Sequence, residues 1–97
     1  MYLLVVYDIS DNRVREKVKR LLWRYGLSPI ARSTYIGKLG SGERTHLAEV
    51  ISRIIGKNDI VILVPVQNID IQHTIFIQKG EVWTKLRERG IIVIGKE

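Results

Sequence analysis

Residues 1–26 read MYLLVVYDISDNRVREKVKRLLWRYG, a sequence that predicts a buried strand followed by an amphipathic helix. Residues 1–7 are rich in β-branched and aromatic side chains and are apolar on both alternating faces, which is typical of a strand in the middle of a sheet. The DISDN turn ends that strand, and Asp11 or Asn12 can cap the helix that follows. Residues 13–25 then form a helix, stopped by Gly26, with one apolar stripe. That stripe consists of Val14, Val18, Leu21, Leu22 and Tyr25.

The rest of the chain completes a repeating pattern of strands and helices. It predicts a strand over 30–36, a glycine-rich loop over 37–42, a helix over 43–55 and strands over 60–66, 71–77 and 91–94. This order favours one α+β domain over residues 1–97, a ferredoxin-like βαββαβ sandwich with an additional C-terminal strand. The arrangement requires residues 71–77 to pair with 60–66 as a hairpin. Both helices then cover one face of the sheet, and a second copy of the chain is the economical cover for the other.

Composition narrows the class of protein. The 97 residues include 16 Lys plus Arg against 10 Asp plus Glu, a net charge of +6 that favours polyanionic partners. The absence of Cys excludes a disulfide framework, a thiolate metal site and a cysteine nucleophile. The longest apolar run is too short to span a membrane, and no N-terminal signal is recognisable. We therefore expect a cytoplasmic protein with no membrane partner.

The positive charge is concentrated in the first helix. Residues 13–25 carry six cations and one anion, and Arg13, Lys17, Arg20 and Arg24 fall in one stripe, with Trp23 opposite the core. One interpretation is a phosphate-binding ridge beside an aromatic ring that can stack or contact a partner. The other is a solvated helix face whose long side chains cover the rim of the core. Charge alone does not decide between them.

The DISDN turn is the candidate metal site. Asp8 closes a buried strand, and Ser10 and Asp11 follow it before a helix begins. Carboxylates in this position can hold Mg²⁺, although one chain offers too few ligands and a two-fold dimer would bring two Asp8 together. Turn formation and helix capping are the simpler roles for these carboxylates, and spacing alone favours them. His46 and His73 lack the spacing of a metal site and are interpreted as ordinary polar residues.

Several short motifs together resemble a known family. They are YDISD at 7–11, Arg15 on a basic helix that ends Tyr25-Gly26, RSTYIG at 32–37 and VPV at 64–66. In order and chain length they are similar to the small CRISPR-associated adaptation protein and endoribonuclease family called Cas two. The chain departs from that pattern at Ala31, Thr34 and Tyr35, where the family often has Gln, Val and Phe.

The resemblance implies a homodimer in which segment 80–97 is exchanged with, or packed on, the partner. It also implies a role in spacer acquisition with Cas one integrase subunits, and a metal-dependent endonuclease acting on RNA or duplex DNA. In that interpretation Asp8 is the catalytic residue and the ligand of Mg²⁺ or Mn²⁺. The secondary candidates near the site are Ser10, Asp11, Arg15 and Tyr35.

Two mechanisms remain open at this point. In the enzyme, Asp8 holds the metal ion that activates water, and Arg15 stabilises the charge that develops on the phosphate. In the alternative, a non-catalytic dimer supports duplex DNA for the integrase and cuts nothing. Either protein would bind nucleic acid through the same cations: Arg13, Arg15, Lys17, Arg20 and Arg24. A related toxin-like mRNA interferase and a small-ligand regulatory domain of the same fold are further alternatives.

Overall fold

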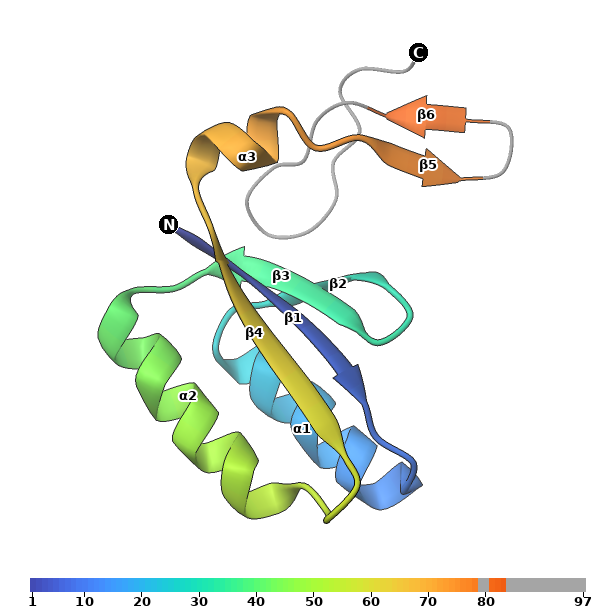
Figure 1. Cartoon of the computed structure of the whole chain (residues 1–97), viewed down its shortest axis with the longest axis vertical. Helices are drawn as coiled ribbons and strands as arrows, with labels where there is room; N and C mark the ends of the chain where they lie inside the picture. The colour runs from blue at the N-terminus through green and yellow to red at the C-terminus, as the bar shows by residue number, and fades with distance from the viewer. Residues whose placement is uncertain (79–80, 84–97) are drawn as a thin grey trace.

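The computed structural model describes residues 1–78 and 81–83, and its main feature is one four-stranded antiparallel sheet (Figure 1). The strands lie in the order β2-β3-β1-β4. Their bounds are Tyr2–Asp8 for β1, Ser28–Ala31 for β2, Thr34–Lys38 for β3 and Ile60–Val66 for β4. Helix α1 (Asn12–Arg24) follows β1, and helix α2 (Ser41–Ile54) follows β3. The ferredoxin-like βαββαβ order is therefore confirmed, with β1 at the centre and β4 at an edge that tolerates Pro65.

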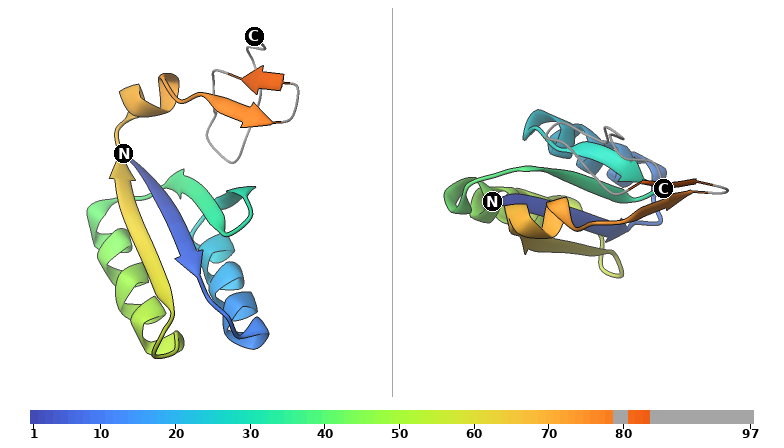
Figure 2. Two further views of the ribbon diagram at one scale, coloured as in Figure 1. Left: turned by 45° about the vertical axis from the view of Figure 1, so that its right-hand side comes forward. Right: turned by 90° about the horizontal axis from the view of Figure 1, so that it is seen from above.

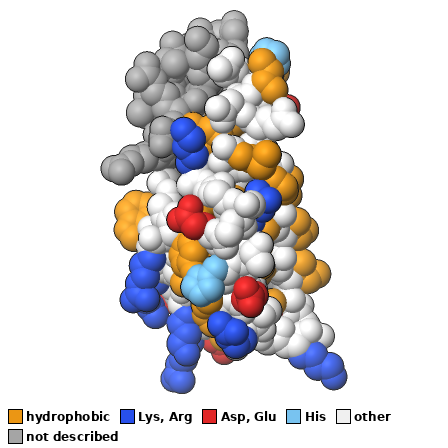
Figure 3. All heavy atoms as spheres, turned by 90° about the vertical axis from the view of Figure 1, so that its left-hand side faces the viewer, with side chains coloured by type: hydrophobic (Ala, Val, Ile, Leu, Met, Phe, Trp, Pro, Cys, Tyr) orange, Lys and Arg blue, Asp and Glu red, His pale blue; other side chains and the backbone are white. Residues whose placement is uncertain are grey.

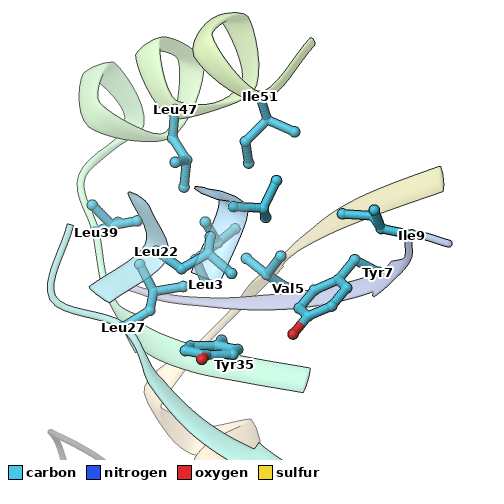
Figure 4. Packing of buried hydrophobic residues seen from close by; sticks show 11 residues of the cluster. Leu3, Val5, Tyr7, Ile9, Leu22, Leu27, Tyr35, Leu39, Leu47 and Ile51 are labelled. Atoms are coloured by element: carbon cyan, nitrogen blue, oxygen red, sulfur yellow. The ribbon is translucent and has the colours of Figure 1, made fainter. Parts of the chain in front are cut away.

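Both long helices lie on the same face of this sheet, as Figure 2 shows in its view from above. Leu3, Val5 and Tyr7 alternate along β1 toward the helices and are buried there. The predicted stripe of α1 meets them, with Val18 and Leu22 fully buried. Figure 4 shows α2 closing the same core through Leu47 and Ile51. The core thus forms between the sheet and two amphipathic helices.

The ends of α1 follow from three particular residues. The Asp11 carboxylate accepts hydrogen bonds from the backbone N–H groups of Arg13 at 2.8 Å and Val14 at 3.0 Å, so it is the helix N-cap. Gly26 ends the helix with a φ of +88°, a conformation that glycine adopts without strain. A Cβ atom at Gly37 would come within 2.8 Å of the Gly26 carbonyl oxygen, so a glycine there lets β3 approach this helix end.

The prediction of one strand over residues 30–36 was wrong. The structure has two strands there, β2 and β3, paired as a hairpin around Arg32 and Ser33. Ser33 adopts a φ of +60°, which no regular strand accommodates. Its carbonyl oxygen accepts a hydrogen bond from the Tyr7 N–H at 3.0 Å, which fixes the turn against the end of β1.

The prediction of a strand over 71–77, paired with 60–66, was also wrong. Residues Asn68–Gln72 form a short helix, α3, and β4 pairs with β1 instead. The Asp70 carboxylate accepts a hydrogen bond from the Gln67 N–H at 3.1 Å, a capping interaction that competes with an extended backbone. Within the described part of the chain, strand β5 (Phe76–Gln78) pairs only with β6 (Glu81–Trp83), in a separate two-stranded sheet. His73, expected in a strand, therefore caps the end of α3.

The additional strand predicted over 91–94 lies outside the described residues. So does the exchange predicted for segment 80–97, apart from the short β6. No helix in the described part of the chain is long and apolar enough to cross a membrane.

Candidate active site and nucleic-acid interface

Asp8 is the last residue of the central strand, and its side chain is exposed. Side chains alternate along β1, so Asp8 lies on the face of the sheet that the two long helices leave open. In the antiparallel register it lies opposite Ile60, the first residue of β4. Among the described residues, no group donates a hydrogen bond to its carboxylate. Asp8 is therefore a carboxylate with unused acceptor capacity beside an apolar surface.

A hollow of about 660 Å³ adjoins Asp8 at this end of the sheet. Its walls come from the end of β1, from α1 and from the β2–β3 hairpin. The side chains that bear on its chemistry are Tyr7, Asp8, Arg15, Lys19, Arg32 and Tyr35. Three cations thus surround one carboxylate, and the hollow favours a negatively charged ligand. The structure thus brings together three of the predicted site residues, Asp8, Arg15 and Tyr35, along one hollow.

The Arg15 side chain is partly buried, and it forms hydrogen bonds with the turn that follows Asp8. Its Nη1 donates a hydrogen bond to the Ile9 carbonyl oxygen at 2.7 Å, and its Nη2 donates to Asn12 Oδ1. These bonds connect α1 to the backbone immediately after β1. Arg15 therefore fixes the position of the turn, in addition to lining the hollow.

Two tyrosines form the inner wall of the hollow. The Tyr7 and Tyr35 rings come from neighbouring strands, with centroids 6.3 Å apart and planes tilted by 37° (Figure 4). Burial raises the pKa of the Tyr7 phenol above its ordinary value of 10.0, and nearby Tyr35 adds to this effect. Tyr7 therefore stays protonated at neutral pH and can donate a hydrogen bond.

Ser10 and Asp11 do not line the hollow. Asp11 caps α1, so the structural role that its spacing favoured is confirmed. The Ser10 N–H donates to Asp59 Oδ1 at 3.4 Å, and the other oxygen of Asp59 accepts from the Gly56 N–H at 2.8 Å. These bonds hold the two loops at this end of the sheet together.

Three polar side chains of the hollow were not among the predicted site residues: Tyr7, Lys19 and Arg32. Lys19 lies one helical turn after Arg15, so helical spacing could have assigned it to the same face. It forms an exposed ion pair with Glu16 at 3.2 Å, and this hydrogen bond raises the pKa of its ammonium group. Arg32 could not be found in this way, because the turn that brings it beside Asp8 was expected to be a strand.

Three other cations of α1 face a different hollow, between α1 and α2. We call it the helix groove: Lys17, Arg20, Leu21 and Arg24 from α1, with Val50 and Ile54 from α2. Arg13 is exposed at the start of α1 and does not line it. Three of the four cations of the predicted stripe thus lie together in this groove, and Arg13 does not. Arg15, which was predicted to bind nucleic acid but lay outside the stripe, lines the Asp8 hollow. Trp23 is 64% exposed, as expected for a residue opposite the core.

The open face of the sheet carries a patch of exposed aliphatic side chains. We call it the open-face patch: Val6 from β1 with Ile60, Ile62 and Val64 from β4. Ile60 and Ile62 are 56% and 51% exposed. Figure 3, which views the molecule from the α2 side, shows hydrophobic side chains along its right-hand edge. Toward the other end of the same face, Ile71 of α3 is buried against Ile36.

The described residues of one chain do not form a complete metal site. They contain no group of three or more His, Asp or Glu side chains placed to hold an ion. Asp8 has the oxygen ligands that Mg²⁺ prefers, but it contributes only one carboxylate. A metal ion at this position would need ligands from a second copy of the chain or from the substrate.

Comparisons of the sequence and the structure with known proteins match the chain to one protein family. A sequence model of the family described as CRISPR associated protein Cas2 matches residues 1–74. A CRISPR-associated endoribonuclease Cas2 of Korarchaeum cryptofilum is 35% identical over 79 residues, which cover 80% of this chain and 85% of the relative. A CRISPR-associated endonuclease Cas1/endonuclease Cas2 fusion of Thermoproteus tenax is 47% identical over 55 residues, 57% of this chain but 21% of the fusion. A crystal structure of Cas2 superposes with a TM-score of 0.60 at 30% identity, covering 66% of this chain and 71% of that chain.

Proposed function

Because the chain belongs to the CRISPR-associated protein Cas2 family, we propose that it is a metal-dependent endoribonuclease of the spacer-acquisition step. Asp8 is its catalytic and metal-binding residue. The observation that carries the proposal is the position of Asp8, an exposed carboxylate beside a hollow lined by Arg15, Lys19 and Arg32. Such a hollow accepts a phosphodiester and has an acceptor group at its edge. The relative from Korarchaeum cryptofilum bears the name endoribonuclease, which supports RNA as the substrate.

The working form is a homodimer joined through the open-face patch. Four exposed aliphatic side chains on adjacent strands make an apolar surface of the kind that marks an interface. Asp8 lies on this same face, opposite Ile60 of the patch. A two-fold axis through the patch would bring the two Asp8 side chains toward each other, because such an axis pairs each surface with its own copy.

Two Asp8 carboxylates suit Mg²⁺ or Mn²⁺, since both ions prefer oxygen ligands. When bound, the ion supplies an activated water and polarises the phosphate. The residues of the chain do the remaining work. Arg15 holds the turn after Asp8, and the cations of the hollow attract the RNA backbone. The protonated Tyr7 can donate a hydrogen bond to a phosphate oxygen.

The direct test compares Asp8→Ala with Glu49→Gln, which removes an exposed carboxylate from α2. The wild-type protein and Glu49→Gln should cleave single-stranded RNA when Mg²⁺ or Mn²⁺ is present and lose this activity with EDTA. Asp8→Ala should remain a folded dimer and lose cleavage by about 100-fold or more, since it removes the proposed metal ligand. Cleavage that persists in Asp8→Ala would move the chemistry to other residues.

A second function is favoured by the helix groove. Lys17, Arg20 and Arg24 lie together in it, over the apolar floor of Leu21, Val50 and Ile54. We propose that this groove binds the backbone of duplex DNA and that the dimer supports DNA for a Cas1 integrase. The Thermoproteus tenax relative, whose name joins Cas1 and Cas2 in one chain, supports the association with Cas1.

Reversing the charge of Lys17, Arg20 and Arg24 tests this second function. Duplex affinity should fall for every sequence, and the dependence of binding on salt should become shallower, because fewer counterions are released. Binding that is insensitive to salt, or unchanged in the variant, would remove the helix groove from the account. RNA cleavage by this variant should remain, since the Asp8 hollow is intact.

A further inference from the structure

The three cations of the Asp8 hollow are not equally available to a ligand. Arg15 uses both terminal nitrogens in hydrogen bonds to Ile9 and Asn12. Lys19 shares its ammonium group with Glu16 in an exposed ion pair, which contributes little stability and can be exchanged for a phosphate at small cost. The Arg32 side chain has no hydrogen bond or ion pair with any described residue. The hollow therefore has one committed cation and two available ones.

The backbone around Arg32 is held firmly in place. The Ser33 carbonyl oxygen accepts the hydrogen bond from the Tyr7 N–H, and Tyr7 is directly followed by Asp8. The Thr34 hydroxyl donates to the Arg32 carbonyl oxygen at 3.3 Å. Val6 pairs with Thr34 at the end of the β1–β3 register, so the turn at Arg32 lies beside the end of β1 that carries Asp8. The turn thus holds the backbone of Arg32 in place, and the Arg32 side chain lines the same hollow as the candidate catalytic carboxylate.

Lys19 approaches the same hollow from a different element. It lies on α1, whereas Arg32 lies on the β2–β3 turn, and both line the hollow with Asp8. An RNA phosphate in the hollow can therefore be contacted from two sides. Arg32 offers a planar fork of donors that matches two phosphate oxygens, and Lys19 offers a mobile point charge.

We infer that Arg32 and Lys19 are the substrate-binding residues of the Asp8 hollow, and that they hold the phosphate backbone of RNA beside the scissile bond. The inference rests on the proposed function for the identity of the substrate. It moves the phosphate-binding role away from Arg15, whose guanidinium holds the turn after Asp8. It also distinguishes this site from the helix groove, whose cations are separate residues of α1.

The test uses near-isosteric substitutions, Arg32→Gln and Lys19→Gln, in the full-length protein. Lys38→Gln is the matched control, because Lys38 is an exposed cation at the opposite end of β3 from Arg32. Arg32→Lys retains the charge but not the fork. Thermal unfolding verifies that each variant is folded. Each protein is then assayed for cleavage of a short single-stranded RNA with Mn²⁺, and for binding of the same RNA in EDTA over a series of KCl concentrations.

We expect Arg32→Gln and Lys19→Gln each to raise KM by about tenfold, with kcat changed by about twofold or less, because they remove backbone binding rather than chemistry. Each should also reduce the slope of log affinity against log salt by about 0.7. Arg32→Lys should retain that slope with a smaller loss of affinity. Lys38→Gln should behave as the wild type in every assay.

The outcomes separate this inference from the proposed function. If the wild type cleaves RNA and Arg32→Gln matches Lys38→Gln in KM and salt slope, the inference is overturned and the endoribonuclease remains. If the wild type cleaves no RNA but Arg32→Gln and Lys19→Gln still reduce the salt slope, the endoribonuclease fails and the phosphate-binding pair stands. RNA that none of these proteins binds would overturn both.

Discussion

The two faces of the central sheet are built by the same strand and have opposite surroundings. Val5 of β1 is fully buried beneath α1 and α2, whereas its neighbour Val6 points to the other face and is 36% exposed. Tyr7 and Asp8 repeat the contrast one step further along, with a buried ring followed by an exposed carboxylate. The helix-covered face gives the domain its stability. The open face leaves an apolar patch and the candidate catalytic residue side by side.

This contrast explains why β1 is apolar at almost every position. A strand that faced water on one side would alternate apolar and polar residues. β1 does not alternate until Asp8, which indicates that its open face is also covered in the working protein. Stability and function are thus assigned to alternate residues of one strand, and substitutions on the two faces should have different consequences.

The largest effect on stability should come from Val5→Ala, and its matched control is Val6→Ala. Val5→Ala leaves a cavity beneath the helices and should reduce the free energy of unfolding by about 2 kcal/mol. This loss should be the same at all protein concentrations in chemical denaturation. Val6→Ala should weaken stability in a concentration-dependent manner, because it acts through association of two chains. Equal, concentration-independent losses would break the distinction between the faces.

A smaller effect is expected at the N-terminus of α1. Asp11→Ala removes the acceptor for the N–H groups of Arg13 and Val14 and should cost about 1 kcal/mol of unfolding free energy. Ser10→Ala changes the adjacent residue, whose hydrogen bond to Asp59 uses its backbone N–H, and should change stability by less than about 0.5 kcal/mol. Because Asp11 caps the helix outside the hollow, the kcat for RNA should stay close to that of the wild type in both variants. A loss of kcat in Asp11→Ala as large as in Asp8→Ala would assign Asp11 to the active site.

The smallest effect concerns Tyr7 at high pH. Burial raises its pKa in the folded state above the ordinary value of 10.0, so the folded protein holds this proton more tightly than the unfolded chain does. The corresponding stability is fully present below pH 10 and is lost as the pH rises through the folded-state pKa. The midpoint temperature of thermal unfolding should therefore fall more steeply above pH 10 for the wild type than for Tyr7→Phe. Parallel curves for the two proteins would contradict the raised pKa.

Much of the covered face could be predicted from local sequence pattern. The periodicity of Val18 and Leu22 identified α1, and Asp11 and Gly26 marked its ends. Strand β4 was predicted with its observed bounds because residues 60–66 form a continuous apolar run. These features depend on residues near one another in the chain, where propensity and capping decide the outcome.

The errors occurred where long-range contacts decide the conformation. The turn at Arg32 and Ser33 has no Gly or Asn, the usual residues of a positive φ, and depends on the hydrogen bond that the Tyr7 N–H donates to the Ser33 carbonyl oxygen. The apolar residues of 71–77 suggested a strand. Ile71 instead lies in α3, and its side chain is buried against Ile36. Asp8 was identified from its place at the end of β1. Arg32 was not, because it reaches the site through a turn at a position where the sequence predicted a strand.

The activity of Asp8 should depend on the open face as an interface between two chains, and the Ile62→Asp variant tests this dependence. Ile62 lies in the open-face patch, opposite Val6 in the register and away from the helix-covered core. The mass in solution, the thermal unfolding and the Mn²⁺-dependent cleavage of RNA should be measured on the same sample. We predict a folded monomer that has lost cleavage although Asp8 is intact. A folded Ile62→Asp monomer that cleaves RNA at the wild-type rate would contradict the account.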